Sequence, residues 1–398
     1  MPQALKPFRA TLYNKERIED FSDVTCPPYD VISKEDLRVL RNRSLFNFSR
    51  VLLAEKNDYP IKRKTFEDWL DRGVLVQDDK DSLYLYEQQY KLNSKKITRY
   101  GVISLLYMDK QAIFPHERTH QAPKEDRKKI IRVVEANLSP IFVIAAARLK
   151  VLKRVYNKYK SFKPFINCKD GDKNTNRLWK IQDPEDIKAL CKDFSKAKLI
   201  IADGHHRFEI SYDYYKKFKN KFKDLDYLMA FLTDCQKGLL IMPTHRIVNI
   251  KASDKEFFAQ LEKYFTIKQV KQRNLEQKLK ARDIFSFGIY RKKKTYFARL
   301  NSIKHLKKIS NKLYQELDSY VFHRLVLPLF QIRGNIEYSH TIEEAKRITG
   351  EKRTAFFLRP ADLDSVIKIS SKGYKLPQKS TYFYPKLLSG LVVRRFSR

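Results

Sequence analysis

The chain has 398 residues, of which 42% are hydrophobic and 13% aromatic, enough for a packed core. Lys and Arg number 82 against 46 Asp and Glu, giving a formal net charge of +36. This composition excludes a disordered, collagen-like or low-complexity chain, and no stretch approaches the roughly 18 apolar residues of a membrane span.

The first half of the sequence alternates between helical and strand patterns. Two long alternating segments are expected to pair across the turn NSKK, and a short apolar run ending at Asp203 predicts a buried strand followed by a helix. The predicted helices are 33–41, 65–75, 124–136 with Pro123 as a plausible first residue, and 205–218; the predicted strands are 45–53, 82–92, 98–108, 139–146 and 198–203.

The second half is a charged mixture of helices and strands, with helices predicted over 257–265 and 313–325 and a solvated edge strand over 291–300. The patterns together predict an α+β protein with mixed sheets and packed helices. We expect a core over 1–250 that holds a nucleotide and substrate site, and an α+β region over 251–398 that returns the loop LPQKST to that site.

The basic charge has two explanations. Nucleic-acid binding is one, and a lysine-rich composition is the other. No helix-turn-helix, zinc-finger or RNA-binding signature accompanies the charge, so we favour composition, although an anionic small substrate would gain from the same field. The N-terminus lacks an apolar signal core and the four cysteines are far apart, which predicts a cytoplasmic protein with reduced thiols and no membrane partner.

The strongest chemical signal is the segment ADGHHR, where a strand turns into a helix. Gly204, His205, His206 and Arg207 lie at the start of that helix, where free backbone N–H groups and the helix dipole favour an anion. Arg207 opposes the dipole unless an anion is present, and a phosphate would resolve the conflict. Asp203 is a candidate to orient a histidine or to hold Mg²⁺, or is an ordinary helix cap.

The segment HERTH matches the zinc-protease pattern H-E-x-x-H through His116, Glu117 and His120. Its context disfavours zinc, because Pro115 and Pro123 leave at most two helical turns and no third ligand follows nearby.

Three further segments carry candidate site residues. Asp30 follows the rigid turn PPY and is a candidate metal ligand or base, or a turn former. Lys379, Ser380 and Thr381 end like a phosphate-binding P-loop but lack its upstream glycines, so they predict a substrate clamp or an ordered loop. His245 and Arg246 follow a strand and are candidates to line the same cleft.

Two resemblances extend this interpretation. ADGHHR resembles the phosphate-binding box of the ParB/sulfiredoxin-like superfamily, whose members include nucleotide-gated DNA clamps and free-serine kinases. Six ordered blocks, from CPPYDVIS to LPQKSTYFYPKLLSG, resemble the family called domain of unknown function 1015. The resemblance implies a ParB/sulfiredoxin-like nucleotide-binding core, neither a Rossmann nor a P-loop fold, and a small-molecule kinase acting most plausibly on free L-serine.

In that kinase interpretation, the resemblance assigns roles to a second group of residues. Glu117 is the candidate base, His116 would steady the phosphoryl group, Lys124 and Arg127 would hold phosphate or a carboxylate, and Asp126 joins Asp203 as a metal ligand. The alternative is an ion-pair cluster at the start of a helix.

The first hypothesis is therefore a Mg²⁺-dependent phosphotransferase that uses ATP or ADP and an alcohol such as free serine. The second is a nucleotide-gated nucleic-acid-binding protein of the ParB type, and the third is a zinc metallohydrolase.

Overall fold

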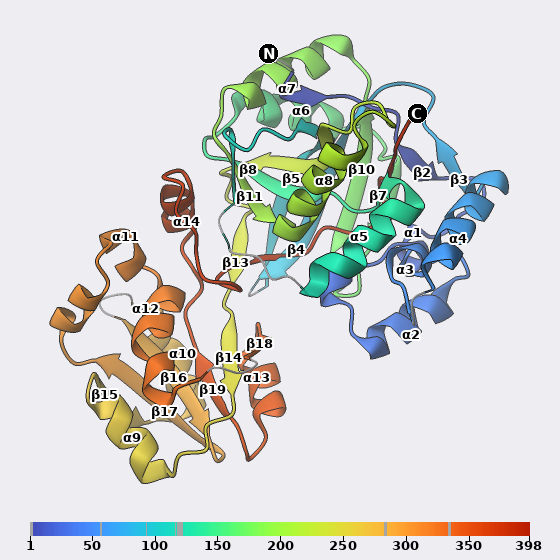
Figure 1. Cartoon of the computed structure of the whole chain (residues 1–398). Helices are drawn as coiled ribbons and strands as arrows, with labels where there is room; N and C mark the ends of the chain where they lie inside the picture. The colour runs from blue at the N-terminus through green and yellow to red at the C-terminus, as the bar shows by residue number, and fades with distance from the viewer. Residues whose placement is uncertain are drawn as a thin grey trace. The chain divides into compact units, whose positions relative to one another are not determined.

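The computed structural model describes residues 3–55, 58–92, 94–115, 117, 122–281, 285–332 and 336–398. The chain divides into two compact units (Figure 1). Unit 1 takes residues 1–115, 119–239 and 385–398, and unit 2 takes 116–118 and 240–384. The expected division at residue 250 thus falls inside unit 2, and the last segment of the chain belongs to unit 1 rather than to the C-terminal region.

Unit 1 is built around a mixed sheet with the strand order β6-β11-β8-β12-β5-β4-β10-β9, and β1 pairs with β5. The strands of this sheet are β1 (Leu5–Lys6), β4 (Leu83–Leu92), β5 (Lys95–Tyr107), β6 (Ile113–Pro115), β8 (Ile141–Ala145), β9 (Ile166–Lys169), β10 (Thr175–Ile181), β11 (Leu199–Asp203) and β12 (Tyr227–Asp234). Among the described pairings only β6–β11 and β8–β12 are parallel, so this is not the parallel sheet of a Rossmann or P-loop fold.

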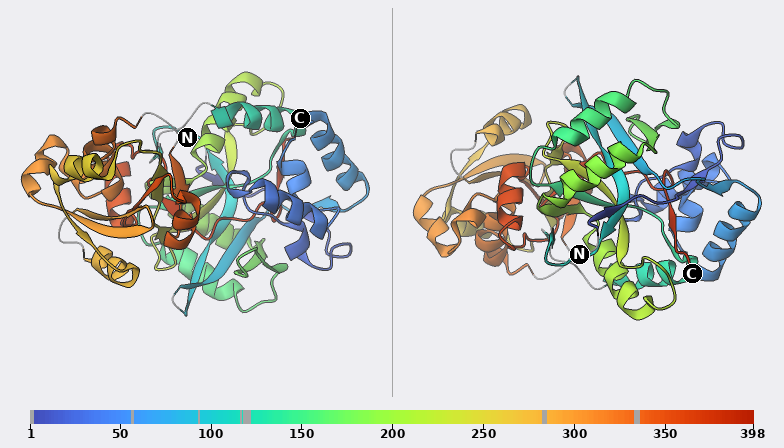
Figure 2. Two further views of the ribbon diagram at one scale, coloured as in Figure 1. Left: turned by 90° about the horizontal axis from the view of Figure 1, so that it is seen from below. Right: turned by 90° about the horizontal axis from the view of Figure 1, so that it is seen from above.

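The remaining elements of unit 1 surround this sheet. Helix α6 lies against β5, and α7 lies against α6 and β1 (Figure 2), while α5 packs on both α4 and α8. Their bounds are α1 (Phe21–Val24), the 3₁₀ turn Tyr29–Val31, α2 (Lys34–Arg43), α3 (Ser49–Leu52), α4 (Tyr59–Asp71), α5 (Ala122–Val134), α6 (Lys150–Tyr159), α7 (Pro184–Ser195), α8 (His205–Phe218), β2 (Thr11–Tyr13), β3 (Leu75–Gln77), β7 (Ala136–Asn137) and β21 (Arg394–Arg395).

The main core of unit 1 follows from alternation along the strands. On β8, for example, Ile141, Val143 and Ala145 share one face and join the same apolar cluster, which Leu152 of α6 and Phe194 of α7 complete. The sheet is buried on this side because each helix contributes an apolar stripe to it.

Unit 2 has an antiparallel sheet of its own, with the order β15-β17-β16-β19-β14-β18. Aromatic side chains fill its core, including Phe257, Phe287 and Phe356. Its elements are β13 (Leu240–Met242), β14 (His245–Val248), α9 (Asp254–Glu262), β15 (Phe265–Gln269), α10 (Gln272–Lys280), β16 (Ser286–Arg291), β17 (Lys294–Leu300), the 3₁₀ turns Ile303–Lys308 and Leu327–Phe330, α11 (Lys312–Gln315), α12 (Asp318–Leu325), β18 (Glu337–Ser339), α13 (Ile342–Thr349), β19 (Thr354–Phe357), α14 (Leu363–Ser370) and β20 (Tyr382–Tyr384).

The chain enters and leaves unit 2 through two paired strands. β13 and β20 run antiparallel, with Leu240 opposite Tyr384 and Met242 opposite Tyr382. Beyond β20 the segment 385–398 returns to unit 1, where β21 pairs with β7.

The α+β prediction with mixed sheets is confirmed, and so are the long pair 82–92 and 98–108 and the strand-to-helix turn at residues 199–218. The strand predicted over 45–53 is wrong: the side chain of Asn47 donates to the carbonyl of Asp23 at 2.6 Å and accepts from the N–H of Ser49 at 3.1 Å, which starts α3. The helix predicted over 313–325 is two helices, α11 and α12, which meet around Leu317. Within the described part of the chain no helix has the length and apolar character to cross a membrane.

Gly101 in the middle of β5 supports a testable prediction about this sheet. An added Cβ would lie 2.3 Å from the carbonyl oxygen of Leu232 and 2.7 Å from the ring of Phe231 on β12. We expect Gly101→Ala to lower the stability of unit 1 by about 1–3 kcal/mol, because close-packed strands cannot absorb the extra methyl group. Urea unfolding followed by tryptophan fluorescence reports unit 1, since Trp69 and Trp179 both lie in it.

Gly171→Ala is the matched control, because nothing lies within 4 Å of a Cβ added there. Equal midpoints for the two variants would contradict the prediction.

Candidate functional site

The turn between β11 and α8 requires glycine at its corner. Gly204 is the N-cap of α8 with φ 90° and ψ 27°, in the left-handed region. A Cβ at this position would lie 2.9 Å from Ile141 Cγ2 and 3.1 Å from the guanidinium of Arg207. Gly204 has no side chain with which to cap the helix, and a helix N-terminus directs backbone N–H groups of the kind that bind an anion.

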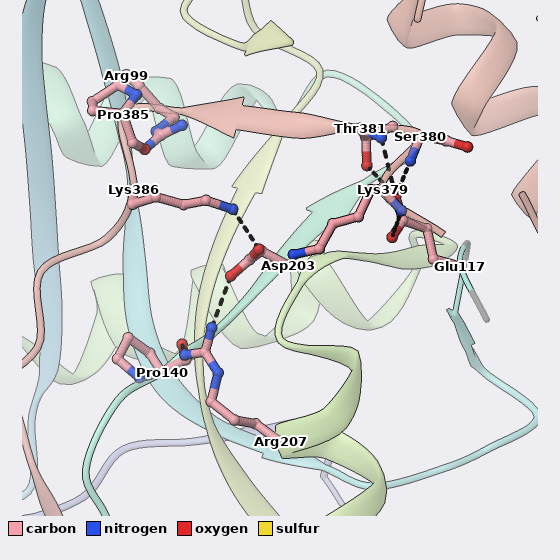
Figure 3. Close-up of polar contacts among 10 residues, drawn as sticks. All are labelled: Arg99, Glu117, Pro140, Asp203, Arg207, Lys379, Ser380, Thr381, Pro385 and Lys386. Atoms are coloured by element: carbon pink, nitrogen blue, oxygen red, sulfur yellow. Dashed lines mark hydrogen bonds and ion pairs between the residues drawn. The ribbon is translucent and has the colours of Figure 1, made fainter. Parts of the chain in front are cut away.

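Asp203, immediately before the corner, is bonded by two cations (Figure 3). Lys386 Nζ lies 2.6 Å from Oδ1, and Arg207 Nη2 lies 2.8 Å from Oδ2. Arg207 also donates through Nη1 to the carbonyl of Pro140. Burial alone would raise the pKa of Asp203, but the charges of Lys386 and Arg207 hold that pKa well below its ordinary value. The anion expected beside Arg207 is therefore supplied, in this structure, by the protein itself.

Two more arginines of unit 1 interact with this group. Arg99, fully buried on β5, donates to Gln88 Oε1 and to the carbonyl of Pro385, and burial lowers its pKa to about 10, against the opposing charge of Asp203 among others. Arg127 of α5 stacks over the ring of Tyr29, with its guanidinium carbon 4.4 Å from the ring centre.

Tyr29 shows that these charges share one neighbourhood. Burial raises its pKa to about 12, with Asp30 and Asp203 adding to the rise and Arg207 and Arg127 opposing it. Asp30 itself is exposed, in the 3₁₀ turn that holds Tyr29.

A cavity of about 60 Å³ connects the two arginines. Its lining combines the polar groups of Tyr29, Arg127 and Arg207 with mostly apolar side chains, and its volume is below the roughly 300–1,000 Å³ of typical small-molecule pockets. The lining residues are Tyr29, Leu52, Arg127, Ile130, Ile131, Ala136, Asn137, Leu138, Ser139, Arg207, Ile210, Ser211 and Leu228.

The carboxylates predicted to hold Mg²⁺ do not fit that role. Asp203 is bonded by two cations, and Asp126 accepts from Arg127 Nε at 2.7 Å and from the Tyr59 hydroxyl at 2.9 Å. Among the described residues no three or more His, Cys, Asp or Glu side chains form a group that could hold a metal ion. Both carboxylates serve to orient arginines rather than to present open oxygens.

Glu117 lies in unit 2 and contacts the loop predicted to bind substrate (Figure 3). Its Oε1 accepts from the N–H groups of Ser380 at 3.1 Å and Thr381 at 3.0 Å and from the Thr381 hydroxyl at 2.9 Å, while Oε2 accepts from the Lys379 N–H at 3.3 Å. His116 and His120 lie outside the described residues, as does the side chain of Lys124, so the zinc pattern and two of the kinase assignments stay predictions.

His245 and Arg246 do not act together, because neighbouring residues on a strand face opposite sides. His245, 3% exposed, accepts from the Leu358 N–H at 3.3 Å and packs against Phe357, and burial lowers its pKa to about 3. It is a neutral core histidine in the structure. Arg246, 1% exposed, reaches the loop instead, with Nη2 3.1 Å from the carbonyl oxygen of Lys379.

The structure thus places the sequence-predicted residues in two groups, one in each unit. Sequence reasoning missed Lys386, Arg99 and Tyr29. Lys386 and Tyr29 lie in the sequence blocks on which the family resemblance is based. Arg99 is a charged residue within the apolar pattern of 98–108, and that exception could have marked it as a candidate site residue.

The chain matches the family described as "Protein of unknown function (DUF1015)" over residues 5–320 and belongs to it. Among curated proteins, none matches this sequence.

Similar solved structures include three of low identity. SbnI with a C-terminal truncation, from Staphylococcus aureus, has a TM-score of 0.40, 11% identity, and coverage of 73% of this chain and 86% of that one. A variant of a free serine kinase in complex with AMP has a TM-score of 0.38, 16% identity, and coverage of 71% and 87%. A conserved hypothetical protein from Pyrococcus furiosus has a TM-score of 0.37, 15% identity, and coverage of 73% and 95%. Likenesses at these TM-scores add nothing to the geometry described above.

The buried histidine of β14 predicts a pH dependence for unit 2. The pKa of His245 is about 3 in the folded chain, against an ordinary value near 6.5, so the unfolded state binds the extra proton first as the pH falls. We expect His245 to lower the free energy of unfolding by about 1.4 kcal/mol per pH unit below roughly pH 6, until the pH nears 3. His245→Asn keeps an acceptor for Leu358 and should remove this contribution, while His323 of the same unit, whose pKa burial lowers to about 4, contributes equally in both proteins.

Pulsed hydrogen exchange of β14 and β19 in urea, at several pH values between 7 and 4, measures the effect. His305→Asn, at a partly exposed position in the same unit, is the control. Identical pH slopes for the wild type and His245→Asn would show that His245 is not the titrating group.

Proposed function

We propose that this protein is a phosphotransferase that binds a nucleotide phosphate at the start of α8 and passes a phosphoryl group to an alcohol. The observation that carries the proposal is the convergence of Lys386 and Arg207 on Asp203, directly before a helix N-terminus whose N-cap is glycine. Such an N-terminus binds phosphate through its N–H groups, and positioned cations neutralise the charge of a transferring phosphoryl group.

A phosphate that binds at this site must compete with Asp203 for two cations. In the resting site Arg207 and Lys386 both bond one carboxylate that is 19% exposed. A phosphate carries more charge than that carboxylate and offers more acceptor oxygens, so it can share both cations while Asp203 keeps their orientation. Arg127 and Tyr29 line the same cavity as Arg207, which supports a role for them in contacting another part of the nucleotide.

Proton removal from the alcohol needs a base within hydrogen-bond reach of the hydroxyl, and an exposed carboxylate beside the cavity is a candidate. Within unit 1, Asp30 is exposed and adjoins Tyr29 of the cavity, so it is the candidate base of this unit. Glu117 remains a second candidate from the sequence. Three parts of the proposal rest on sequence resemblance and residue type. They are free L-serine as the acceptor, ATP or ADP as the donor, and the binding of substrate by Lys379, Ser380 and Thr381.

Phosphorus NMR tests the proposal. Purified protein is incubated with Mg²⁺, ATP or ADP, and a mixture of free amino acids, and the spectrum is followed for a new phosphomonoester resonance, with serine the expected acceptor. We expect Arg207→Ala to reduce its rate of appearance at least about 100-fold, because the variant lacks the fork that grips phosphate. Arg207→Lys keeps the positive charge but lacks the paired N–H donors of the guanidinium. Its rate of product formation should lie between the rates of Arg207→Ala and the wild type.

Arg72→Ala is the matched control, since Arg72 also pairs with an aspartate four residues before it, at 3.2 Å, but lies on the surface. Tryptophan fluorescence verifies that unit 1 is folded in each variant. Nucleotide binding without turnover would refute the transfer step and would make salt-dependent DNA binding the next measurement. Absence of nucleotide binding would refute the phosphate site as well.

A further inference from the structure

Residues 379–381 of unit 2 direct successive backbone N–H groups at one point. Lys379 has φ 53°, a left-handed conformation that is uncommon for a residue with a side chain. This turn of the backbone aims the N–H groups of Lys379, Ser380 and Thr381 at the carboxylate of Glu117, with nitrogen–oxygen distances from 3.0 to 3.3 Å. Such a group of converging N–H donors, a nest, is an anion-binding arrangement.

A buried arginine lies directly behind the nest. Arg246 is 1% exposed, and its guanidinium donates to two carbonyl oxygens, those of Thr244 and Lys379. Within the described part of the chain its buried Nε has no hydrogen-bond partner, and the same is true of the hydroxyl of Thr244, two residues earlier. Burial lowers the pKa of Arg246 to about 10, against the charges of Tyr338 and Glu117 among others.

These unpartnered atoms call for a ligand or a water, because a buried polar group without a hydrogen bond costs about 1–3 kcal/mol. His323 adds a third, since its Nε2 is also buried without a partner among the described residues, and its pKa is lowered to about 4 by burial and then by the charge of Arg246. Arg246, which donates to the carbonyl of Lys379, links these three atoms to the nest, and together they indicate a polar site that is incompletely filled.

We propose that the nest of residues 379–381, with Arg246 behind it, is a binding site for the carboxylate of a small molecule, and that Glu117 occupies it as an internal ligand. A carboxylate is favoured because the nest already accommodates one, with Oε1 shared by two N–H groups and the Thr381 hydroxyl. The inference rests on contacts inside unit 2 and holds whether or not the chain transfers phosphoryl groups. It also gives Glu117 a role other than that of a base, since its oxygens are occupied by donors.

Removing the internal ligand tests the site. In Glu117→Ala the amides of residues 379–381 lose their acceptor, and we expect their hydrogen exchange to accelerate at least about tenfold. Acetate should then restore their protection in a saturable way, with an apparent Kd at least about tenfold lower than in the wild type, where Glu117 competes. Exchange of peptides covering residues 376–384, measured by mass spectrometry at constant ionic strength, gives both quantities.

Glu256→Ala is the matched control in the same unit. Glu256 also accepts from a backbone N–H and a hydroxyl, those of Ser253, at 2.9 and 2.8 Å, but at the exposed start of α9. Acetate should not restore protection there. Equal restoration at both positions, or none at residues 379–381, would overturn the proposal.

A second variant and a second anion complete the experiment. If Glu117→Ala does not fold, Glu117→Gln keeps the side-chain shape without its charge, and acetate should compete with it more strongly than with the wild-type glutamate; equal competition would overturn the proposal. Inorganic phosphate at the same ionic strength should protect less well than acetate. Stronger protection by phosphate would overturn the assignment to a carboxylate.

Discussion

The arrangement of unit 1 around its candidate site depends on two ion pairs made by one aspartate. Asp203 ends β11, Arg207 lies one turn into α8, and Lys386 belongs to a segment 183 residues further along the chain. Burying the carboxylate without these partners would cost several kcal/mol, so the three positions are fixed together. The orientation of Arg207 and the return of the segment 385–398 to unit 1 are both tied to that carboxylate.

The two candidate sites share a design in which an internal carboxylate holds the donors in place. Asp203 does this for the cations of unit 1 and Glu117 for the nest of unit 2. A carboxylate attached to the chain is present at a high effective concentration, so a weak or adventitious anion competes poorly with it. A ligand succeeds when it offers more charge, better geometry or further contacts, and the internal anion therefore sets a threshold for specificity.

Sequence patterns predicted the local features well and the tertiary contacts poorly. The turn from β11 to α8 was predictable because an apolar run, Asp-Gly and a helical period follow one another directly. The strand wrongly predicted at 45–53 shows the limit, since alternation there is overridden by the side-chain bonds of Asn47. Lys386 and Arg99 gained their significance only from distant partners. The opposite orientation of His245 and Arg246 was available from the two-residue period of a strand alone.

The interruption of unit 1 by residues 240–384 also bears on the order of events during synthesis. All the residues of the unit 2 sheet emerge before Lys386 and before β21, which pairs with β7. Unit 2 can therefore form its sheet while unit 1 still lacks the second of the two cations that bond Asp203 and the partner strand of β7. Until that late segment arrives, Asp203 has only Arg207 as a cation, so unit 1 completes its folding after the whole of unit 2 has emerged.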